Sequence, residues 1–400
     1  MTWLAVVGLG EDGLDGLAPA ARLLVARAET LVGGARHLAL AAPGPGVETL
    51  TWQAPLSLTL DAIAARRGRR VTVLATGDPM WFGIGVALAK RFAADAMTVI
   101  PAPGAFSLAC ARLGWPLAET VCLTLHGRPL ALVNAHLAPG ARLLLLAEDG
   151  GTAPALASHL TAAGFGASTM TALEHMGGPR EARREATAAA WGARCGADLA
   201  TLAVHLVADA GARVLAPVPG LPDDAFVHDG QITKREVRAA TLAALGPLPG
   251  HVLWDVGAGA GSVAIEWMRG ARGVRAVAIE REPSRARAIA ANAATLGVPG
   301  LAIVEGAAPE ALAGLEPPDA VFVGGGVRAD LLAACWAALK PGGRLVANAV
   351  TVESEAAVAA FRAAHDGTLA RIAISRAEPL GDGLVWRALA PVTQMRAVKP

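Results

Sequence analysis

The chain has 400 residues, 54% of them hydrophobic, and its 35 basic and 34 acidic residues leave a formal net charge of +1. This length predicts two domains, and the charge balance gives no electrostatic basis for nucleic-acid binding. No apolar run is long enough for a membrane span, the four cysteines form no C-x-x-C pair, and the histidines lack metal-ligand spacing. We therefore expect a cytoplasmic protein with no membrane segment and no metal site.

The N-terminal half alternates strand-like and helix-like runs, which is typical of an α/β domain. Residues 2–7 carry no basic segment and no cleavage site, so they predict a first strand rather than a signal peptide. Three glycine-bearing loops follow strand-like runs, at 8–10 after 2–7, at 77–83 after 71–74, and at 101–107 after 97–100. We expect these loops to share one cleft, in which Asp78 either contacts a ligand or forms an Asx turn.

The clearest break in the pattern is residues 213–224, where three prolines and a glycine crowd out regular structure. We therefore place a linker at 209–224, between a first domain at 1–208 and a second domain at 225–400.

The C-terminal half begins with a predicted helix at about 233–245 and then alternates strands with helices. Strands are predicted near 251–256, 274–280, 301–305, 319–323 and 343–349, with two late candidates at 369–375 and 384–390 forming a hairpin that closes the sheet. One helix between consecutive strands predicts right-handed parallel crossovers. A ligand is then expected beyond the carboxyl ends of the strands.

The most informative motif is residues 255–262 (DVGAGAGS), where an apolar strand turns into a helix on glycines, so that a ligand can approach backbone N–H groups. The spacing is G-x-G-x-G, and Ser262 stands where the dinucleotide pattern needs its last glycine, which argues against a nicotinamide enzyme. Glu280 ends the next strand, 19 residues after Gly261, where its carboxylate can accept hydrogen bonds from ribose hydroxyls. Asp255 either orients the loop or meets an ammonium group of the cofactor.

In this order and at these intervals, the C-terminal motifs resemble the class I S-adenosylmethionine-dependent methyltransferases. Residues 232–238 (ITKREVR) and 305–312 (EGAAPEAL) are similar to the decarboxylating precorrin methyltransferases of cobalamin synthesis, although Ala307 stands where Asp is common. Thr233 matches a cofactor-contacting threonine of that family and also fits a capping box with Glu236. The resemblance implies as cofactor-binding residues Thr233, Asp255, Gly257, Ala258, Gly259, Ala260, Gly261, Glu280, Ala307 and Ala308, and as substrate-binding residues Gly324 and Gly325.

The N-terminal half, from residue 3 to about 208, resembles the tetrapyrrole methylases, a different fold that uses the same cofactor. The resemblance lies in the three glycine-bearing loops and in residues 125–128 (LHGR) and 174–181 (EHMGGPRE). Ala105 and Phe106 depart from the family's paired serines, so only Ser107 is carried over there. The resemblance implies as cofactor-binding residues Gly77, Asp78, Pro79 and Ser107, and as substrate-binding residues Gly8, Gly10, His126 and Arg128.

The expected fold class is therefore α/β, with a tetrapyrrole-methylase fold followed by a Rossmann-like class I fold around a mostly parallel seven-stranded sheet. The pairing resembles the bifunctional decarboxylating methyltransferases of cobalamin biosynthesis. It implies methylation of precorrin-6B at carbon 5 by the first domain, and methylation at carbon 15 with loss of carbon dioxide from the carbon 12 acetate by the second, giving precorrin-8X. It also implies one S-adenosylmethionine per domain, a tetrapyrrole substrate, and a homo-oligomer such as a tetramer, with neither nucleic acid nor membrane as a partner.

Three alternatives remain open on the sequence: a two-domain methyltransferase that acts on another tetrapyrrole without decarboxylation, an NAD-dependent oxidoreductase, and a tetrapyrrole carrier without catalysis. The sequence identifies no catalytic residue. Glu266 and Glu353 are candidates for proton transfer, but a surface or helix-start position fits each of them better.

Overall fold

The computed structural model describes residues 2–400, and the chain forms two compact units. The first unit contains the chain up to Arg128 together with Ala138–Val214, and the second contains Pro129–Leu137 and Leu215–Pro400. Each unit combines helices with strands in sheets, so the predicted α/β class is confirmed. Within residues 2–400, none of the helices combines the length and the apolar character needed to cross a membrane.

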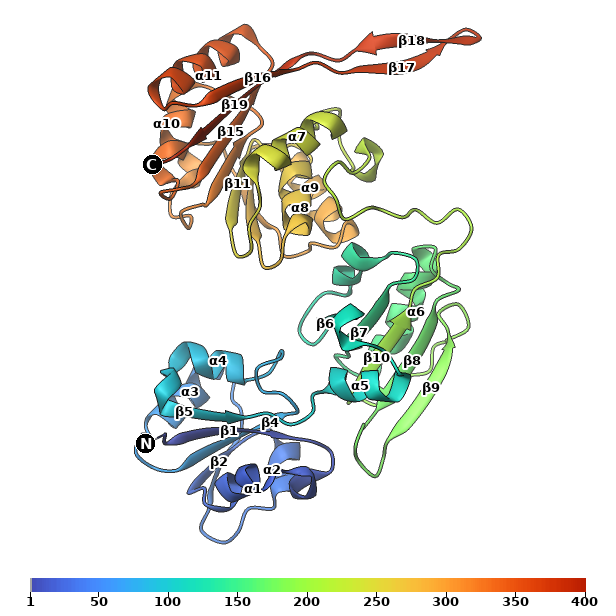
Figure 1. The fold of residues 1–400 in the computed structure, drawn as a ribbon, viewed down its shortest axis with the longest axis vertical. Helices are drawn as coiled ribbons and strands as arrows, with labels where there is room; N and C mark the ends of the chain where they lie inside the picture. The colour runs from blue at the N-terminus through green and yellow to red at the C-terminus, as the bar shows by residue number, and fades with distance from the viewer. Residues whose placement is uncertain (1) are drawn as a thin grey trace. The chain divides into compact units, whose positions relative to one another are not determined.

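The first unit opens with a five-stranded, fully parallel sheet that is covered on both faces. Its strands, in spatial order, are β3 (Glu48–Leu50), β2 (Thr30–Val32), β4 (Val71–Thr76), β1 (Leu4–Leu9) and β5 (Met97–Ile100). Helices α1 (Pro19–Ala26) and α2 (Ala35–Ala41) cover one face, and α3 (Leu56–Ala64) and α4 (Gly85–Arg91) cover the other (Figure 1). Burial on both faces explains why β1 reads as a continuous apolar run.

The second sheet of the first unit is mixed. Its strands, in spatial order, are β6 (Val121–Thr124), β7 (Arg142–Leu146), β10 (Ala200–His205), β8 (Thr169–Glu174) and β9 (Ala182–Thr187). Only the β6–β7 pair is parallel. Helix α5 (Ala105–Leu113) packs on one face through Phe106 and Ala109, which meet Leu144 and Leu173, and α6 (Thr152–Ala162) follows β7.

The second unit is built on a seven-stranded sheet. Its strands, in spatial order, are β13 (Ala302–Glu305), β12 (Arg275–Glu280), β11 (Val252–Val256), β14 (Ala320–Val323), β15 (Arg344–Ala349), β19 (Val392–Val398) and β16 (Thr368–Ile372). The first five are parallel, as predicted, and β19 is antiparallel to both of its neighbours. The strand order reverses at β11, so the carboxyl ends of β11 and its neighbours form a topological switch point.

Helices cover both faces of this sheet (Figure 1). One face packs against α7 (Arg235–Leu245), α8 (Ser262–Gly270) and α9 (Pro283–Thr295), and the other packs against α10 (Ala329–Ala338) and α11 (Val352–Ala364). Adjacent residues of β11 divide between the two cores: Leu253 faces the first and Trp254 the second.

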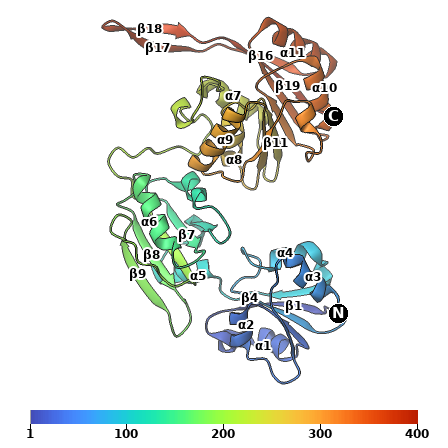
Figure 2. The same cartoon turned by 180° about the vertical axis from the view of Figure 1, so that it is seen from behind.

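The predicted closing hairpin is wrong as a pair: its first strand, predicted at 369–375, lies in the sheet as β16 (Thr368–Ile372), but its second, predicted at 384–390, does not. The place of the hairpin in the sheet is taken by β16 and β19, whereas β17 (Ser375–Leu380) and β18 (Gly383–Ala388) pair only with each other. They form a two-stranded ribbon that extends away from the sheet in both views (Figures 1 and 2). The ribbon carries exposed apolar side chains, including Trp386 at 75% exposure. Its composition is therefore that of a core strand, although its side chains are not buried.

Candidate functional site

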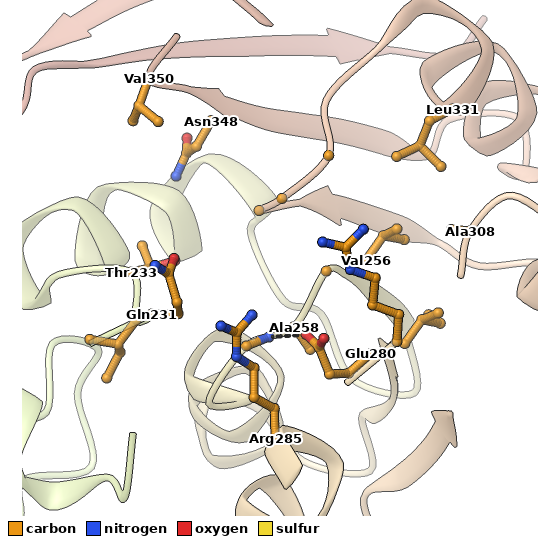
Figure 3. A pocket seen from close by; sticks show the side chains of 18 of the residues that line it. Gln231, Thr233, Val256, Ala258, Glu280, Arg285, Ala308, Leu331, Asn348 and Val350 are labelled. Atoms are coloured by element: carbon orange, nitrogen blue, oxygen red, sulfur yellow. Dashed lines mark hydrogen bonds between the residues drawn. The ribbon is translucent and has the colours of Figure 1, made fainter. Parts of the chain in front are cut away.

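A cavity of about 580 Å³ opens at the carboxyl ends of the parallel strands of the second unit (Figure 3). It is lined by the loops that follow β11, β12, β13 and β14, by the segment before α7, and by residues of β15, β16 and β19. This is the edge at which the strand order predicts a ligand. Within residues 2–400, no cluster of His, Cys, Asp and Glu has the composition of a metal site.

The glycine loop after β11 forms one wall of this cavity. Gly257 and Gly259 have φ of +70° and +58°, which favour glycine. A Cβ on Gly257 would lie 2.9 Å from the backbone nitrogen of Gly325, so the loops after β11 and β14 pack backbone against backbone. The N–H groups of Gly257 and Ala258 donate to the Ile279 carbonyl, and that of Gly259 donates to Glu280, so these bonds hold the loop in place. The loop leaves no room for a side chain at Gly257, which suits a cofactor held against the backbone.

Glu280 lies at the carboxyl end of β12, where the sequence places it. Its Oε2 accepts a hydrogen bond from the Gly259 N–H (2.8 Å), and its Oε1 accepts one from the Glu282 N–H (3.0 Å). The side chain is buried and lines the cavity beside Ala258 (Figure 3). Glu280 therefore ties the glycine loop to β12 and presents an anionic acceptor to the cavity.

Asp255, Ala260 and Gly261 lie behind the loop rather than on the cavity wall. Asp255 is 1% exposed; its Oδ2 accepts from the Ala264 N–H in α8 (2.9 Å), and its Oδ1 has no partner in the described chain. Burial raises the pKa of Asp255 to about 7, against the opposing effect of the Ala264 N–H, and the nearby charge of Glu280 raises it further. Asp255 thus orients the helix start, and a direct contact with a cofactor stays a prediction.

Thr233 lines the cavity, but its predicted capping box is wrong. Helix α7 begins at Arg235 with Lys234 as its N-cap residue and no side-chain cap. Glu236, the expected cap partner, instead forms an ion pair with Arg376 at the base of the ribbon and accepts a hydrogen bond from its guanidinium (2.6 Å). Thr233 therefore keeps its side chain available at the cavity, where Figure 3 shows it on the side of Gln231.

The other implied positions of the second unit also lie at the cavity. Ala307 and Ala308 follow β13, and Gly324 and Gly325 follow β14; all four line the wall. The structure thus brings most of the predicted C-terminal residues to one place.

Sequence reasoning missed the positive charges and the polar floor of this cavity. Lys234, Arg281, Arg285 and Arg328 line it, and Arg285 pairs with Asp229 (2.8 Å). Each follows a predicted strand or begins a helix, but nothing in the sequence marks these cations among 35 basic residues. Asn348 also lines the cavity, and a polar residue inside the apolar strand 343–349 was an available signal.

The two candidate proton carriers lie away from the cavity wall. Glu353 is exposed in the first turn of α11, which confirms the predicted position at the start of a helix. Glu266 is neither exposed nor at a helix start: it is 3% exposed and accepts hydrogen bonds from Arg238 Nε (2.6 Å) and the Leu221 N–H (3.0 Å). It therefore forms part of a buried ion pair.

In the first unit, the three glycine-bearing loops meet as predicted. The Gly77 N–H donates to the Leu9 carbonyl (3.2 Å), and the Ala102 N–H donates to the Gly77 carbonyl (3.0 Å). A Cβ on Gly8 would overlap the Gly77 carbonyl oxygen, so the first two loops touch through their backbones. Gly104, at the start of α5, lies against Asp78.

The side chains of these loops are placed as follows. Asp78 Oδ1 accepts from the Met80 N–H (2.8 Å), which is the Asx turn, and the Pro79 carbonyl accepts from the Gly85 N–H (2.9 Å). Ser107 is exposed in the first turn of α5, and Gly10 precedes Asp12, whose side chain lies against it.

His126 and Arg128 are exposed after β6. The Arg128 guanidinium lies 5.6 Å from the centre of the Phe82 ring, which belongs to the loop that begins at Gly77. His126 Nδ1 is 3.9 Å from a carboxylate oxygen of Glu148. The structure therefore places Arg128 beside the second glycine-bearing loop.

Glu11, next to the first loop, is a further polar group that sequence reasoning missed. It accepts from His175 (3.0 Å) and pairs with Arg36, so it joins the first loop to the late motif at 174–181. Burial would raise the pKa of Glu11, but the hydrogen bonds from His175 and Arg36 lower it overall. Burial lowers the pKa of the neighbouring His37 to about 4.

Comparison with known families assigns a class to each half of the chain. Residues 4–191 match the model of the tetrapyrrole (corrin/porphyrin) methylases, and residues 224–399 match the precorrin methyltransferase domain. The fold and the sites thus define a methyltransferase with two unrelated methylase folds, whose family implies S-adenosylmethionine as methyl donor.

Relatives that match the whole chain narrow this class. A precorrin-6Y C(5,15)-methyltransferase [decarboxylating] from Sinorhizobium is 49% identical over 393 residues, which cover 98% of this chain and 95% of that protein. The chain belongs to the family of decarboxylating precorrin-6Y C(5,15)-methyltransferases.

Two shorter relatives resemble parts of the chain. A cobalt-precorrin-7 C(5)-methyltransferase from Salmonella typhimurium is 38% identical over 31% of this chain and 62% of its own length. A probable cobalt-precorrin-6B C(15)-methyltransferase (decarboxylating) from Saccharolobus solfataricus is 33% identical over 34% of this chain and 72% of its own length.

Proposed function

We propose that this chain is a bifunctional methyltransferase of cobalamin biosynthesis. It transfers methyl groups from S-adenosylmethionine to carbons 5 and 15 of precorrin-6B and removes carbon dioxide from the carbon 12 acetate, giving precorrin-8X. The observation that carries this proposal is the cavity of the second unit. One part of this cavity is lined by the backbone of the glycine loop and by the buried Glu280. Another part is lined by apolar side chains and by cations from neighbouring loops.

The glycine part of the cavity fits the cofactor. Gly257 and Gly259 put no side chain between the loop backbone and the cavity, and Glu280 presents a buried carboxylate that can accept bonds from ribose hydroxyls. Bound there, S-adenosylmethionine supplies an activated methyl group. The contribution of the protein is to hold the donor and acceptor carbons in line away from water, which can supply much of the rate.

The rest of the cavity fits a flat macrocycle with a rim of carboxylates. Val350, Ile372 and Val392 offer apolar contact to the ring. Lys234 and Arg328 can pair with carboxylates that stay on the product, because charge-assisted hydrogen bonds to carboxylates are strong and directional.

We assign carbon 5 methylation to the first unit and carbon 15 methylation with decarboxylation to the second, with one S-adenosylmethionine in each. The support is that separate proteins carry the C(5) name and the decarboxylating C(15) name, and that each resembles only about a third of this chain. In the first unit, the loop with Gly77, Asp78 and Pro79 would hold the cofactor, and Arg128 would meet the substrate.

The test is the mass of the product formed from precorrin-6B and methyl-labelled S-adenosylmethionine. Two labelled methyl groups gained and one carbon dioxide lost establish the function. Two methyl groups without loss of carbon dioxide would replace it with the alternative, a two-domain methyltransferase that does not decarboxylate.

The division of labour is tested by one variant in each unit. Asp78→Ala should abolish carbon 5 methylation and leave decarboxylation, whereas Gly259→Arg, which fills the cavity of the second unit, should do the reverse. Folded variants that each lose both activities would contradict independent sites.

We also propose that the chain forms a homo-oligomer, such as a tetramer, through the β17–β18 ribbon. Leu380, Leu384 and Trp386 are 61%, 73% and 75% exposed on a two-stranded ribbon, and a ribbon of two strands needs further packing for stability. Light scattering should show that Trp386→Glu lowers the oligomeric mass, and an unchanged mass would contradict this role. Free cysteines throughout the described chain support a reducing compartment, and we infer the cytoplasm.

A further inference from the structure

Three buried polar side chains from three elements form a network beside the cavity of the second unit. Asn348 on β15 and Gln394 on β19 are directly paired across the two strands, and Thr241 lies on α7. Asn348 Nδ2 and Gln394 Nε2 both lie 3.0 Å from Thr241 Oγ1, and Gln394 Nε2 lies 3.0 Å from Asn348 Oδ1. Of the three, only Asn348 lines the cavity.

The protons of this network fix the orientation of the Asn348 amide. Thr241 has one hydroxyl proton, and it donates that proton to the Val237 carbonyl (2.8 Å). Thr241 Oγ1 must therefore accept from both amide nitrogens. Asn348 consequently turns its nitrogen to Thr241 and its oxygen to Gln394.

One N–H of Asn348 is left for a ligand. A side-chain amide nitrogen has two N–H groups, and Thr241 takes one of them. In residues 2–400, no acceptor faces the second one. Because Asn348 is 9% exposed and lines the cavity, this is a neutral donor whose direction is held by two buried partners.

The strand residues that line the cavity with this donor are apolar. Val350, Ile372 and Val392 line the cavity from the same three strands, β15, β16 and β19, or directly after them. The four cations come from other elements, and Figure 3 shows Arg285 beside Glu280, on the side of the cavity away from Asn348. A carboxylate bound at Asn348 would therefore lose its water and accept one hydrogen bond from a neutral N–H group. It would face no cation from these three strands.

We propose that Asn348 holds the acetate carboxylate that leaves as carbon dioxide, while the loop cations hold the carboxylates that remain. This inference rests on the proposed function. In the step, the bond between the methylene and carboxyl carbons breaks, and its electron pair passes into the conjugated macrocycle. Carbon dioxide leaves, and the methylene carbon takes up one proton from water and becomes a methyl group.

A neutral donor suits this step better than a cation does. The carboxylate loses its charge as carbon dioxide forms, so a cation would stabilise the reactant more than the transition state. An amide in an apolar wall orients the leaving group, and exclusion of water favours the uncharged product. Thr241 and Gln394 act as positioning residues, because they reach the substrate only through Asn348.

The experiment compares Asn348→Ala with the wild-type full-length chain on two substrates. The first is precorrin-6B, with release of carbon dioxide as the readout. The second is an analogue that already carries a methyl group at carbon 12, with transfer of labelled methyl to carbon 15 as the readout. We expect release of carbon dioxide to fall roughly 10- to 100-fold, because the leaving carboxylate loses its orientation, and methyl transfer to the analogue to change less than about threefold.

Asn348→Asp is the second variant, since it keeps the shape and places a carboxylate opposite the leaving one. It should lower release of carbon dioxide at least as far as Asn348→Ala does, and Arg328→Gln is the matched control, which should lower both readouts together. Equal losses on both substrates in the folded Asn348 variants, or no loss on either, would overturn the inference. Wild-type protein that releases no carbon dioxide would instead refute the proposed function itself.

Discussion

Replacing Glu266 by Gln separates a structural role of this carboxylate from a catalytic one. Glu266 accepts bonds from Arg238 Nε and from the N–H groups of Gly220 and Leu221. Arg238 is fully buried and also binds Asp223 and the carbonyl of Thr233. The pair therefore fastens the segment before α7, which lines the cavity, to α8.

The expected loss of stability is large. Gln has one acceptor oxygen for three donors, and its NH₂ group would face at least one of them. Removing one partner of a buried ion pair costs about 3 to 5 kcal/mol. At about 2 to 4 °C per kcal/mol for a unit of this size, the melting transition of the second unit should fall by about 6 to 20 °C.

Calorimetry on the full chain measures this shift, and the rate of carbon dioxide release is measured well below the transition. The exposed Glu353 provides a matched control, because Glu353→Gln should change stability by less than about 1 kcal/mol. A general acid or base contributes about 10²- to 10⁴-fold. If Glu266→Gln melted like the wild type but lost carbon dioxide release by such a factor, the structural reasoning would be refuted.

Three further predictions follow from the same unit. Gly257→Ala should weaken S-adenosylmethionine binding in the second unit, measured by calorimetric titration, because the added Cβ would press on the Gly325 backbone at a φ of +70°; unchanged affinity would contradict the backbone-packed loop. The pKa of Asp255 is raised from 3.8 to about 7, so the folded chain holds a proton that the unfolded chain releases, and unfolding free energy should fall by about 4 kcal/mol as pH rises from 4 through 7. Urea titrations of Asp255→Asn should lack that slope, and an identical slope would contradict the assignment. Arg328→Gln should raise the KM for precorrin-6B several-fold with a smaller change in kcat, and an unchanged KM would remove Arg328 from substrate binding.

The parallel strands of the second unit could be predicted closely because each is buried on both faces. Residues 252–254 and 320–323 read as continuous apolar runs, and β11 and β14, which contain them, lie within a residue of the predicted ranges. The glycines and the acidic residue after them were informative for a related reason, since a loop packed against another backbone tolerates few residue types.

The end of the chain could not be predicted in the same way. Trp386 and Leu384 have the composition of core residues, yet they lie exposed on the ribbon, while Gln394 is buried in the strand that completes the sheet. An apolar pattern predicts that a segment is buried, but it does not identify the surface that buries it. We propose another copy of the chain as that surface for the ribbon. Gln394 is buried because Thr241 and Asn348 satisfy it, and those partners are 153 and 46 residues away.

The sequence spacing placed Asp255 and Glu280 at the ends of neighbouring strands, but it did not show which of the two side chains points into the cavity. Asp255 and Glu280 both come from strand ends that meet at the switch point, but Asp255 turns back to the N-terminus of α8 and Glu280 turns to the cavity. A carboxylate has about four acceptor positions, and two of those on Glu280 are used by Gly259 and Glu282. The remaining positions are enough for two ribose hydroxyls, so one side chain can fix the glycine loop and still bind the cofactor. The proposed double use explains why a carboxylate at this point of the chain is informative, since we expect an amide in its place to lose one of the two functions.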